Sequence, residues 1–455
     1  MKIRSLLLGS IAAAGLASGA QAADLGVLTS LDVCDSLGLS GLTISSDTNC
    51  LQITGGINYE FNWGDYKVGG DATATPPVQG GNRPLVVTPD DTFGIADSNG
   101  VNDWSSKMEA WIRFVATADS DFGPAKAVIK IKDEQYTKTF DGVQSYDGDD
   151  TGGAIFDEAY VSIGDSTVIM AGKKGSIIQK GDDEPFNYLG LFHSENVDAG
   201  ISYSNGLIDG VEDGGHVIQI VSDLGNGISV GAGLEDLNDE VASRAGTAVG
   251  YIAYAGDNLT AHVTVLATGV LDGDINGYAM HAGLTGTFDA FKIRAAIAGN
   301  HDNVTDMTNW QGLVSGQATF DMFTIALSGE AERVNDINSG GFGGSVGFAV
   351  SDGVQVNVGG RYFDSDLDTS DNEGYQVAAQ LVAAVTETLK LTGEIGVYGE
   401  NAGYGGQAVG TYENVFYGSA EVAWAPGGDL TTSLKGTAYS NGGYKATFKA
   451  AKTFQ

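Results

Sequence analysis

One feature constrains the possible folds of this chain most. Short segments of alternating apolar and polar residues are joined alternately by tight turns and by longer loops. From Gly246 onward, strand-length segments alternate large apolar with small or polar residues, which is the two-residue period of a pleated strand. In Phe291–Ile297, Lys292 and Arg294 share one face and apolar side chains the other. Turns centred near residues 257, 289, 321 and 352 are 31 or 32 residues apart. That spacing fits two strands of ~10 residues with a turn and a loop.

Nine tight turns predict the strand number. With both chain ends on the side of these turns, nine turns imply twenty strands, and we expect sixteen to twenty. A β-sandwich or solenoid would also alternate, but the pairing of short turns with longer Gly-rich loops, and the aromatic residues beside the turns, favour a barrel surrounded by lipid. We therefore predict an all-β transmembrane antiparallel barrel with short periplasmic turns and long external loops. The predicted turns lie at 119–123, 164–166, 224–227, 256–258, 288–291, 320–323, 351–353, 386–388 and 426–429.

The first residues predict an export signal. Met1-Lys2-Ile3-Arg4 is basic, and an apolar run from Leu6 to Ala17 and the small-residue motif Ala20-Gln21-Ala22 follow it. This order is typical of a secretory signal peptide, so we assign residues 1–22 to the signal and place its cleavage after Ala22. The alternative is a membrane anchor, which would need ~20 apolar residues.

Composition and charge indicate which partners the chain can bind and how its domains are organised. Charged residues make up 18% of the 455 residues, below the ~25% of an average soluble domain. A formal net charge of −35 repels nucleic acid and favours cations, although it is also what a solvated loop surface would carry. We find no linker after residue 50. We therefore expect an N-terminal segment, 23–50, followed by the barrel, 51–455.

The chain has two cysteines, Cys34 and Cys50. In an exported protein a pair this close predicts a disulfide, and two free thiols are the alternative. Without a nearby pair of His they do not make a zinc site. The five His are scattered, and we find neither a phosphate-binding loop nor a nucleophile motif such as G-x-S-x-G. We therefore expect no enzyme activity, no metal and no cofactor.

Several segments resemble the alphaproteobacterial outer-membrane porin family. The resemblance covers the signal region, the paired-cysteine block (Val33-Cys34-Asp35 and Asn49–Gly55) and the segment Phe156–Gly164. It implies a general diffusion porin in the outer membrane, inserted in lipid as a homotrimer that passes small hydrophilic solutes and ions. Two features depart from the family. The turn count exceeds the usual sixteen strands, and the chain ends in Phe454-Gln455 rather than Phe.

The resemblance also implies that the third external loop folds into the barrel and narrows it. Residues 175–190 follow the predicted strand Val168–Lys174 and have the apolar content that packing on an inner wall requires. Their acidic cluster, Asp182, Asp183 and Glu184, is our candidate for the pore constriction. The opposite wall should then be basic, and an acidic loop facing a basic wall sets a transverse field that filters ions. The candidate wall residues are Arg113, Lys130, Lys132 and Lys173. Ordinary lumen or loop charge is the alternative role for all of these residues.

The sequence therefore predicts a water-filled channel for passive diffusion, with a preference for cations from the acidic excess. A substrate-specific channel for a sugar or an organic acid is one alternative, and a barrel adhesin is another.

Overall fold

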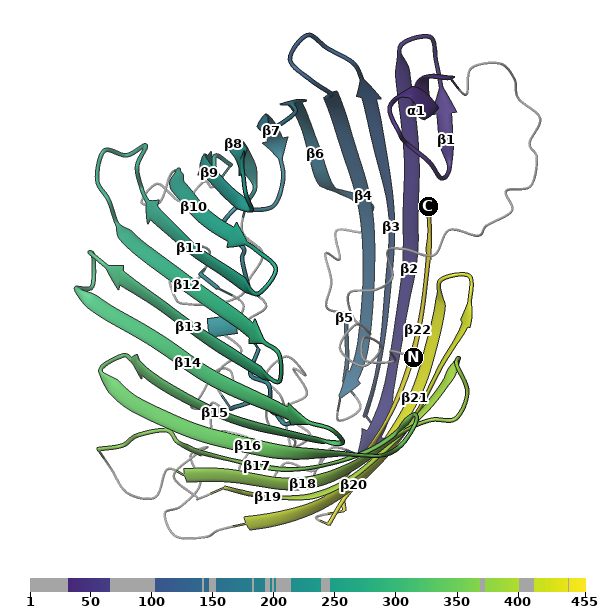
Figure 1. The fold of residues 1–455 in the computed structure, drawn as a ribbon, viewed down its shortest axis with the longest axis vertical. Helices are drawn as coiled ribbons and strands as arrows, with labels where there is room; N and C mark the ends of the chain where they lie inside the picture. The colour runs from purple at the N-terminus through teal and green to yellow at the C-terminus, as the bar shows by residue number, and fades with distance from the viewer. Residues whose placement is uncertain are drawn as a thin grey trace.

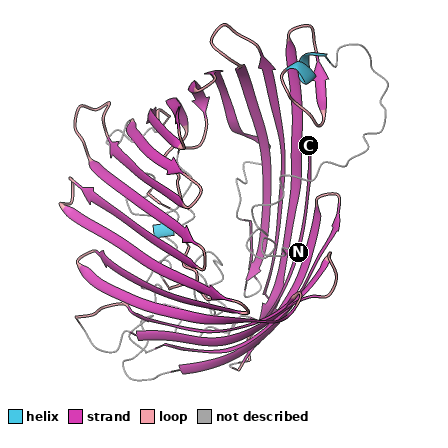
Figure 2. Ribbon diagram, in the orientation of Figure 1, coloured by secondary structure: helices cyan, strands magenta, loops and turns pink. Residues whose placement is uncertain are grey.

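The computed structural model describes residues 32–65, 103–140, 143–146, 153–181, 184–192, 197–198, 200–201, 214–238, 246–368, 373–400, 413–440 and 442–455. The predicted signal peptide, 1–22, lies outside them. Strands make up nearly all of the described wall (Figure 2). No described helix is long and apolar enough to cross a membrane. The elements are α1 Asp32–Ser36, β1 Thr43–Ser45, β2 Asn49–Asp65, β3 Asp103–Ala118, β4 Ala125–Phe140, β5 Val143–Tyr146, β6 Ile155–Gly164, β7 Thr167–Lys173, β8 His216–Gly225, β9 Ile228–Glu235, β10 Thr247–Ala255, β11 Leu259–Thr268, β12 Gly277–Phe288, β13 Phe291–Asp302, β14 Met307–Phe320, β15 Phe323–Val334, β16 Ile337–Ser351, β17 Val354–Asp364, β18 Glu373–Ala384, β19 Leu389–Glu400, β20 Glu413–Gly427, β21 Leu430–Tyr439 and β22 Tyr444–Phe454.

The sheet closes on itself. β2 pairs with β3 along one edge and with the last strand, β22, along the other. Figure 1 shows this seam, where the last strands, in yellow, run beside β2, in purple. All the described strands except β1 and β5 belong to the closed ring, which is a 20-stranded antiparallel barrel. The strand number is the one that nine turns predict.

Tight turns join the strands at one end of the barrel. Each of the nine predicted turns lies between two consecutive strands of the ring, from β3–β4 to β20–β21. Asp289 and Asp321 have positive φ angles of 43° and 52° in two of these turns. Aspartate tolerates this conformation better than most residues, because its short polar side chain bonds the local backbone.

The connections at the opposite end are not all long, which corrects the sequence expectation. β15 and β16 are joined by Asn335-Asp336 alone, and both residues have positive φ, at 53° and 66°. That is the conformation of a type I′ hairpin turn, in which Asn and Asp are favoured. Gly-rich composition alone does not distinguish such a hairpin from a long loop.

The two faces of the wall have opposite chemistry. On β13, Phe291, Ile293 and Ile297 are about half exposed, whereas the alternating Ala296 and Ala298 are buried. The face that carries exposed, large apolar side chains is the outer face, as expected for a barrel surrounded by lipid. Polar and charged side chains gather on the inner face.

Aromatic side chains line the outer face beside the tight turns. Phe291 lies 5.9 Å from Phe320, and Phe323 lies 5.1 Å from Phe348, between ring centroids. Phe288 pairs across its turn with Phe291. A band of this kind is typical of the interfacial girdle of membrane barrels.

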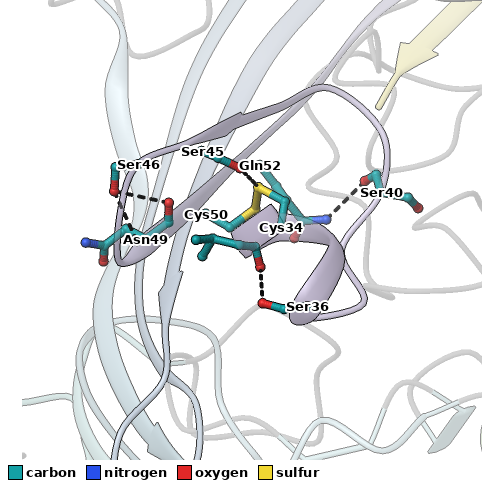
Figure 3. The surroundings of a disulfide bond; sticks show 9 residues. Cys34, Ser36, Ser40, Ser45, Ser46, Asn49, Cys50 and Gln52 are labelled. Carbon is teal, nitrogen blue, oxygen red and sulfur yellow. Dashed lines mark hydrogen bonds between the residues drawn. A yellow bond between two sulfur atoms is a disulfide. The ribbon is translucent and has the colours of Figure 1, made fainter. Parts of the chain in front are cut away.

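A small N-terminal unit, made of α1 and β1, covers the seam between β2 and β22 at the end of the barrel where the tight turns lie. Cys34 of α1 forms a disulfide with Cys50 of β2, with an S–S distance of 2.05 Å (Figure 3). β1 pairs with Leu51 and its neighbours on β2, whereas the pairing of β22 with β2 begins only at Gly55. β1 therefore covers the short stretch of β2 edge that β22 leaves open, which protects it from pairing with other chains.

Candidate pore constriction and lumen wall

The segment after β7 packs on the inner face of the barrel in three apolar clusters. Each cluster joins buried side chains of residues 177–201 to buried inner-face side chains of the wall. A solvated external loop would not bury such residues, and the burial fixes the segment in place. The clusters are Ile177, Ile178 and Ile201 with Val249, Tyr251, Leu266, Ala279 and Ala298; Leu191 and Val197 with Ala296 and Leu313; and Phe192 with Phe363 and Tyr398.

Polar contacts hold the beginning of this segment. The backbone N–H of Ile177 donates to Oε1 of Glu235 at 3.1 Å. Gln219 donates to the carbonyl of Gly175 at 3.1 Å and to Glu235 at 2.8 Å. Both side chains are fully buried, and such groups require hydrogen-bond partners.

A basic group and two imidazoles lie in the same region of the wall. The amino group of Lys180 lies 4.2 Å from the ring centroid of Tyr251. Burial lowers the pKa of this amino group, and Lys174 lowers it further. On the neighbouring strands, Nε2 of His262 lies 3.0 Å from Nδ1 of His281. One imidazole must donate and the other accept in this contact, so the two cannot both be protonated.

The acidic candidates are only partly described. Asp182 and Asp183 lie outside the described residues. Glu184 is exposed, and its carbonyl accepts a hydrogen bond from Nη1 of Arg294 at 2.6 Å. The backbone of Glu184 therefore contacts the wall at β13.

Three of the four basic candidates lie on the inner face, and each is paired with a carboxylate. Nε of Arg113 lies 3.2 Å from Glu158, and Nζ of Lys130 lies 2.5 Å from Asp157. The wall of β3, β4 and β6 is therefore a ladder of ion pairs rather than a bare positive surface. Lys132 completes it, with its Nζ 2.8 Å from Glu109 and 3.3 Å from Glu134.

Lys173 lies on the outer face, not in the pore wall where we expected it. The β6–β7 register pairs Lys173 with Ala159, and Ile169, on the same face of β7, is about half exposed. Its amino group donates to the carbonyl of Phe156 at 2.7 Å. The inner face of β6 is the one that carries Tyr160, whose hydroxyl accepts from Arg113 at 3.3 Å.

The acidic partners in the ladder cannot be identified from the sequence pattern alone. Asp157 is the extra residue of a bulge in β6, where the register with β4 shifts between Lys130 and Ile131. The bulge lets Asp157 reach Lys130 while Glu158 reaches Arg113. A strict two-residue period would place these consecutive carboxylates on opposite faces, so it could not identify both of them.

The sequence is similar to those of known porins. Porin Omp2b of Brucella suis biovar 1 is 27% identical over 238 residues, which is 50% of this chain and 55% of the relative. Omp2b of Brucella abortus matches over the same length with the same identity. The chain is related to the alphaproteobacterial porins. The matches span only about half the length of these porins, and no protein-family model matches the chain.

Two solved structures that the chain resembles are distant from it in sequence. An anion-selective porin of Comamonas acidovorans shares 12% identity at a TM-score of 0.38, over 89% of this chain and all of that one. OccAB4 of Acinetobacter baumannii shares 9% identity at a TM-score of 0.46, over 88% of this chain and 98% of that one. The architecture therefore rests on the strand pairings described above.

Proposed function

We propose that the chain is an outer-membrane porin, a water-filled channel for passive diffusion of small hydrophilic solutes and ions. A closed barrel with apolar side chains outside and a charged wall inside carries this proposal. Such a barrel places its polar lining where water and solutes pass, and porins of about sixteen to eighteen strands enclose an aqueous channel. The relationship to the Brucella porins supports it.

The channel prefers cations in this proposal. The formal charge is −35, and carboxylates pair Arg113, Lys130 and Lys132 of the inner wall. The narrowest part lies between Asp182, Asp183 and Glu184 and the ladder of β3, β4 and β6. Carboxylates at a constriction attract cations and exclude anions. The functional unit in the outer membrane is a homotrimer, formed after the signal peptide is removed.

Recording from the purified protein in planar bilayers tests the function. We expect discrete conductance steps that scale with salt, and a zero-current potential in a salt gradient with the sign of cation preference. Absence of steps would contradict the channel and leave adhesion to be tested. Block of ion current by one sugar or organic acid at low concentration would indicate a substrate-specific channel instead.

A triple variant tests the constriction. Replacing Asp182→Asn, Asp183→Asn and Glu184→Gln removes charge with little change of volume, so we expect the zero-current potential to shift towards anions. An unchanged potential and conductance would contradict this placement of the constriction.

A further inference from the structure

Two arginines of the inner wall contact the segment 184–192 in the same way. Arg294 of β13 and Arg361 of β17 each donate a hydrogen bond to a carbonyl of the segment. Each guanidinium also lies over the ring of a nearby Phe of the segment. The backbone N–H of that same Phe donates to a side chain of the wall. We call each arrangement an arginine clamp.

The Arg294 clamp holds the start of the segment. Nη1 of Arg294 donates to the carbonyl of Glu184 at 2.6 Å, and Nε donates to Oγ1 of Thr285 at 3.0 Å. The guanidinium lies 4.7 Å from the ring centroid of Phe186. The N–H of Phe186 donates to Oγ of Ser315 at 2.8 Å. The neighbouring strand β12 thus orients the arginine, and β14 receives the backbone of Phe186.

The Arg361 clamp repeats this arrangement at the end of the segment and is more buried. Nη1 of Arg361 donates to the carbonyl of Leu191 at 2.8 Å, and Nε donates to Oε1 of Gln376 at 2.8 Å. The guanidinium lies 4.1 Å from the ring centroid of Phe192, whose N–H donates to Oε1 of Glu330 at 2.9 Å. Arg361 is only 6% exposed, so its contacts are sheltered from water.

Between the clamps, two positions of the wall that the segment approaches closely are glycines. A Cβ on Gly343 would lie 2.9 Å from Nδ2 of Asn187, and one on Gly359 would lie 2.9 Å from Cε1 of Tyr188. The two glycines therefore let the middle of the segment approach the backbone of the wall. Burial raises the pKa of the Tyr188 hydroxyl, and the nearby Glu394 raises it further, so this side chain stays neutral against the wall.

We propose that Arg294 and Arg361 are positioning residues that fix how far segment 184–192 projects into the lumen and so set the size limit for solutes. The proposal rests on the proposed porin function. Arginine suits this role because its planar guanidinium donates in two directions and stacks on an aromatic ring at the same time. Lysine, a point charge on a flexible chain, does not combine these contacts.

The test uses Arg294→Ala, Arg361→Ala, their double variant and the conservative double variant Arg294→Lys/Arg361→Lys. Arg333→Ala is the matched control, because Arg333 is an arginine of β15 that forms an ion pair with the exposed Asp336 rather than a contact with the segment. Two quantities are measured for each protein. Hydrogen exchange reports the protection of the amides of Phe186 and Phe192, and bilayer recording with added polyethylene glycols of graded size reports the exclusion limit of the pore.

In the double alanine variant, we expect the amides of Phe186 and Phe192 to exchange at least about tenfold faster. Without the arginines, the segment is no longer held against the wall side chains that accept the hydrogen bonds of these amides. We expect the polymer exclusion limit of this variant to change and its current to become noisier. The lysine variant should lie between it and the wild type, and Arg333→Ala should match the wild type. If the double alanine variant does not fold, the single alanine variants and the lysine variant carry the same comparison.

Wild-type protection in a folded double variant would overturn the proposal. Loss of protection with an unchanged exclusion limit would overturn it too, because the segment would then not set the pore size. A wild type that forms no channel would contradict the porin function itself. Amide exchange does not depend on conduction, so it would still report whether the arginines hold the segment.

Discussion

Lys132 lies between two carboxylates of the inner wall, 2.8 Å from Glu109 and 3.3 Å from Glu134. Lys132→Met leaves both carboxylates without this cation and should make the zero-current potential more cation-selective. Glu109→Gln should shift it in the opposite direction. Arg333→Met removes the same charge beside Asp336, where both side chains are substantially exposed, so screening by salt should make its effect smaller. Equal shifts for Lys132→Met and Arg333→Met would contradict a special role of the ladder.

Single side chains could be assigned to a face from the sequence only where the alternation is regular and both faces are distinct. Arg113, Lys130 and Lys132 alternate with large apolar residues, so the sequence placed them on the inner face. Lys173 is in phase with the small Ala171, which gave no such contrast, and Lys173 lies on the outer face. The partners across strands depend on register, which the bulge at Asp157 changes.

At the scale of elements, the disulfide holds the N-terminal unit to the first strand of the ring. Cys34 and Cys50 are 16 residues apart, and a cross-link closing a loop of this size stabilises by roughly 3 kcal/mol in the chain-entropy description. Cys34→Ser/Cys50→Ser should lower the free energy of unfolding by about that amount, measured by urea titration. Reduction of the wild type should reproduce the loss.

The matched control is Ser36→Ala, which removes only an exposed hydrogen bond within α1. Its unfolding midpoint should stay close to that of the wild type. In the double serine variant, amide exchange should also increase in β1, because its few pairs with β2 form a short edge that the disulfide holds in place. An unchanged midpoint in the double serine variant would show that β1 stays paired without the covalent link.

At the scale of the whole molecule, the strand number followed from the sequence because tight turns are local. Residues such as Asp289 and Gly353 mark a turn by their own backbone preference. The contacts that residues 177–178, 191–192, 197 and 201 make with the inner wall are not local. Ile178 and Phe192 pack against strands that lie far away along the chain, and only the closed ring brings those strands to the segment. Apolar content showed that the segment would pack, but not on which strands.

The net charge of the whole chain leads to a prediction about how ion selectivity depends on salt concentration. A formal charge of −35 acts on ions through the solution, and salt screens it over ~30 Å at 0.01 M but only ~3 Å at 1 M. Cation preference that arises from the general charge should therefore fall steeply as salt rises at a constant concentration ratio across the bilayer. Preference that arises from carboxylates at the constriction acts over a few ångströms and should largely persist. Measuring zero-current potentials at a fixed concentration ratio from 0.01 M to 1 M separates the two contributions.

We expect the cation preference of the wild type to fall steeply as salt rises and to reach a residual value at 1 M. The Asp182→Asn/Asp183→Asn/Glu184→Gln variant should show the same steep fall but should have lost the residual cation preference at 1 M. A triple variant with the wild-type potential at 1 M would assign all of the selectivity to charge outside the constriction.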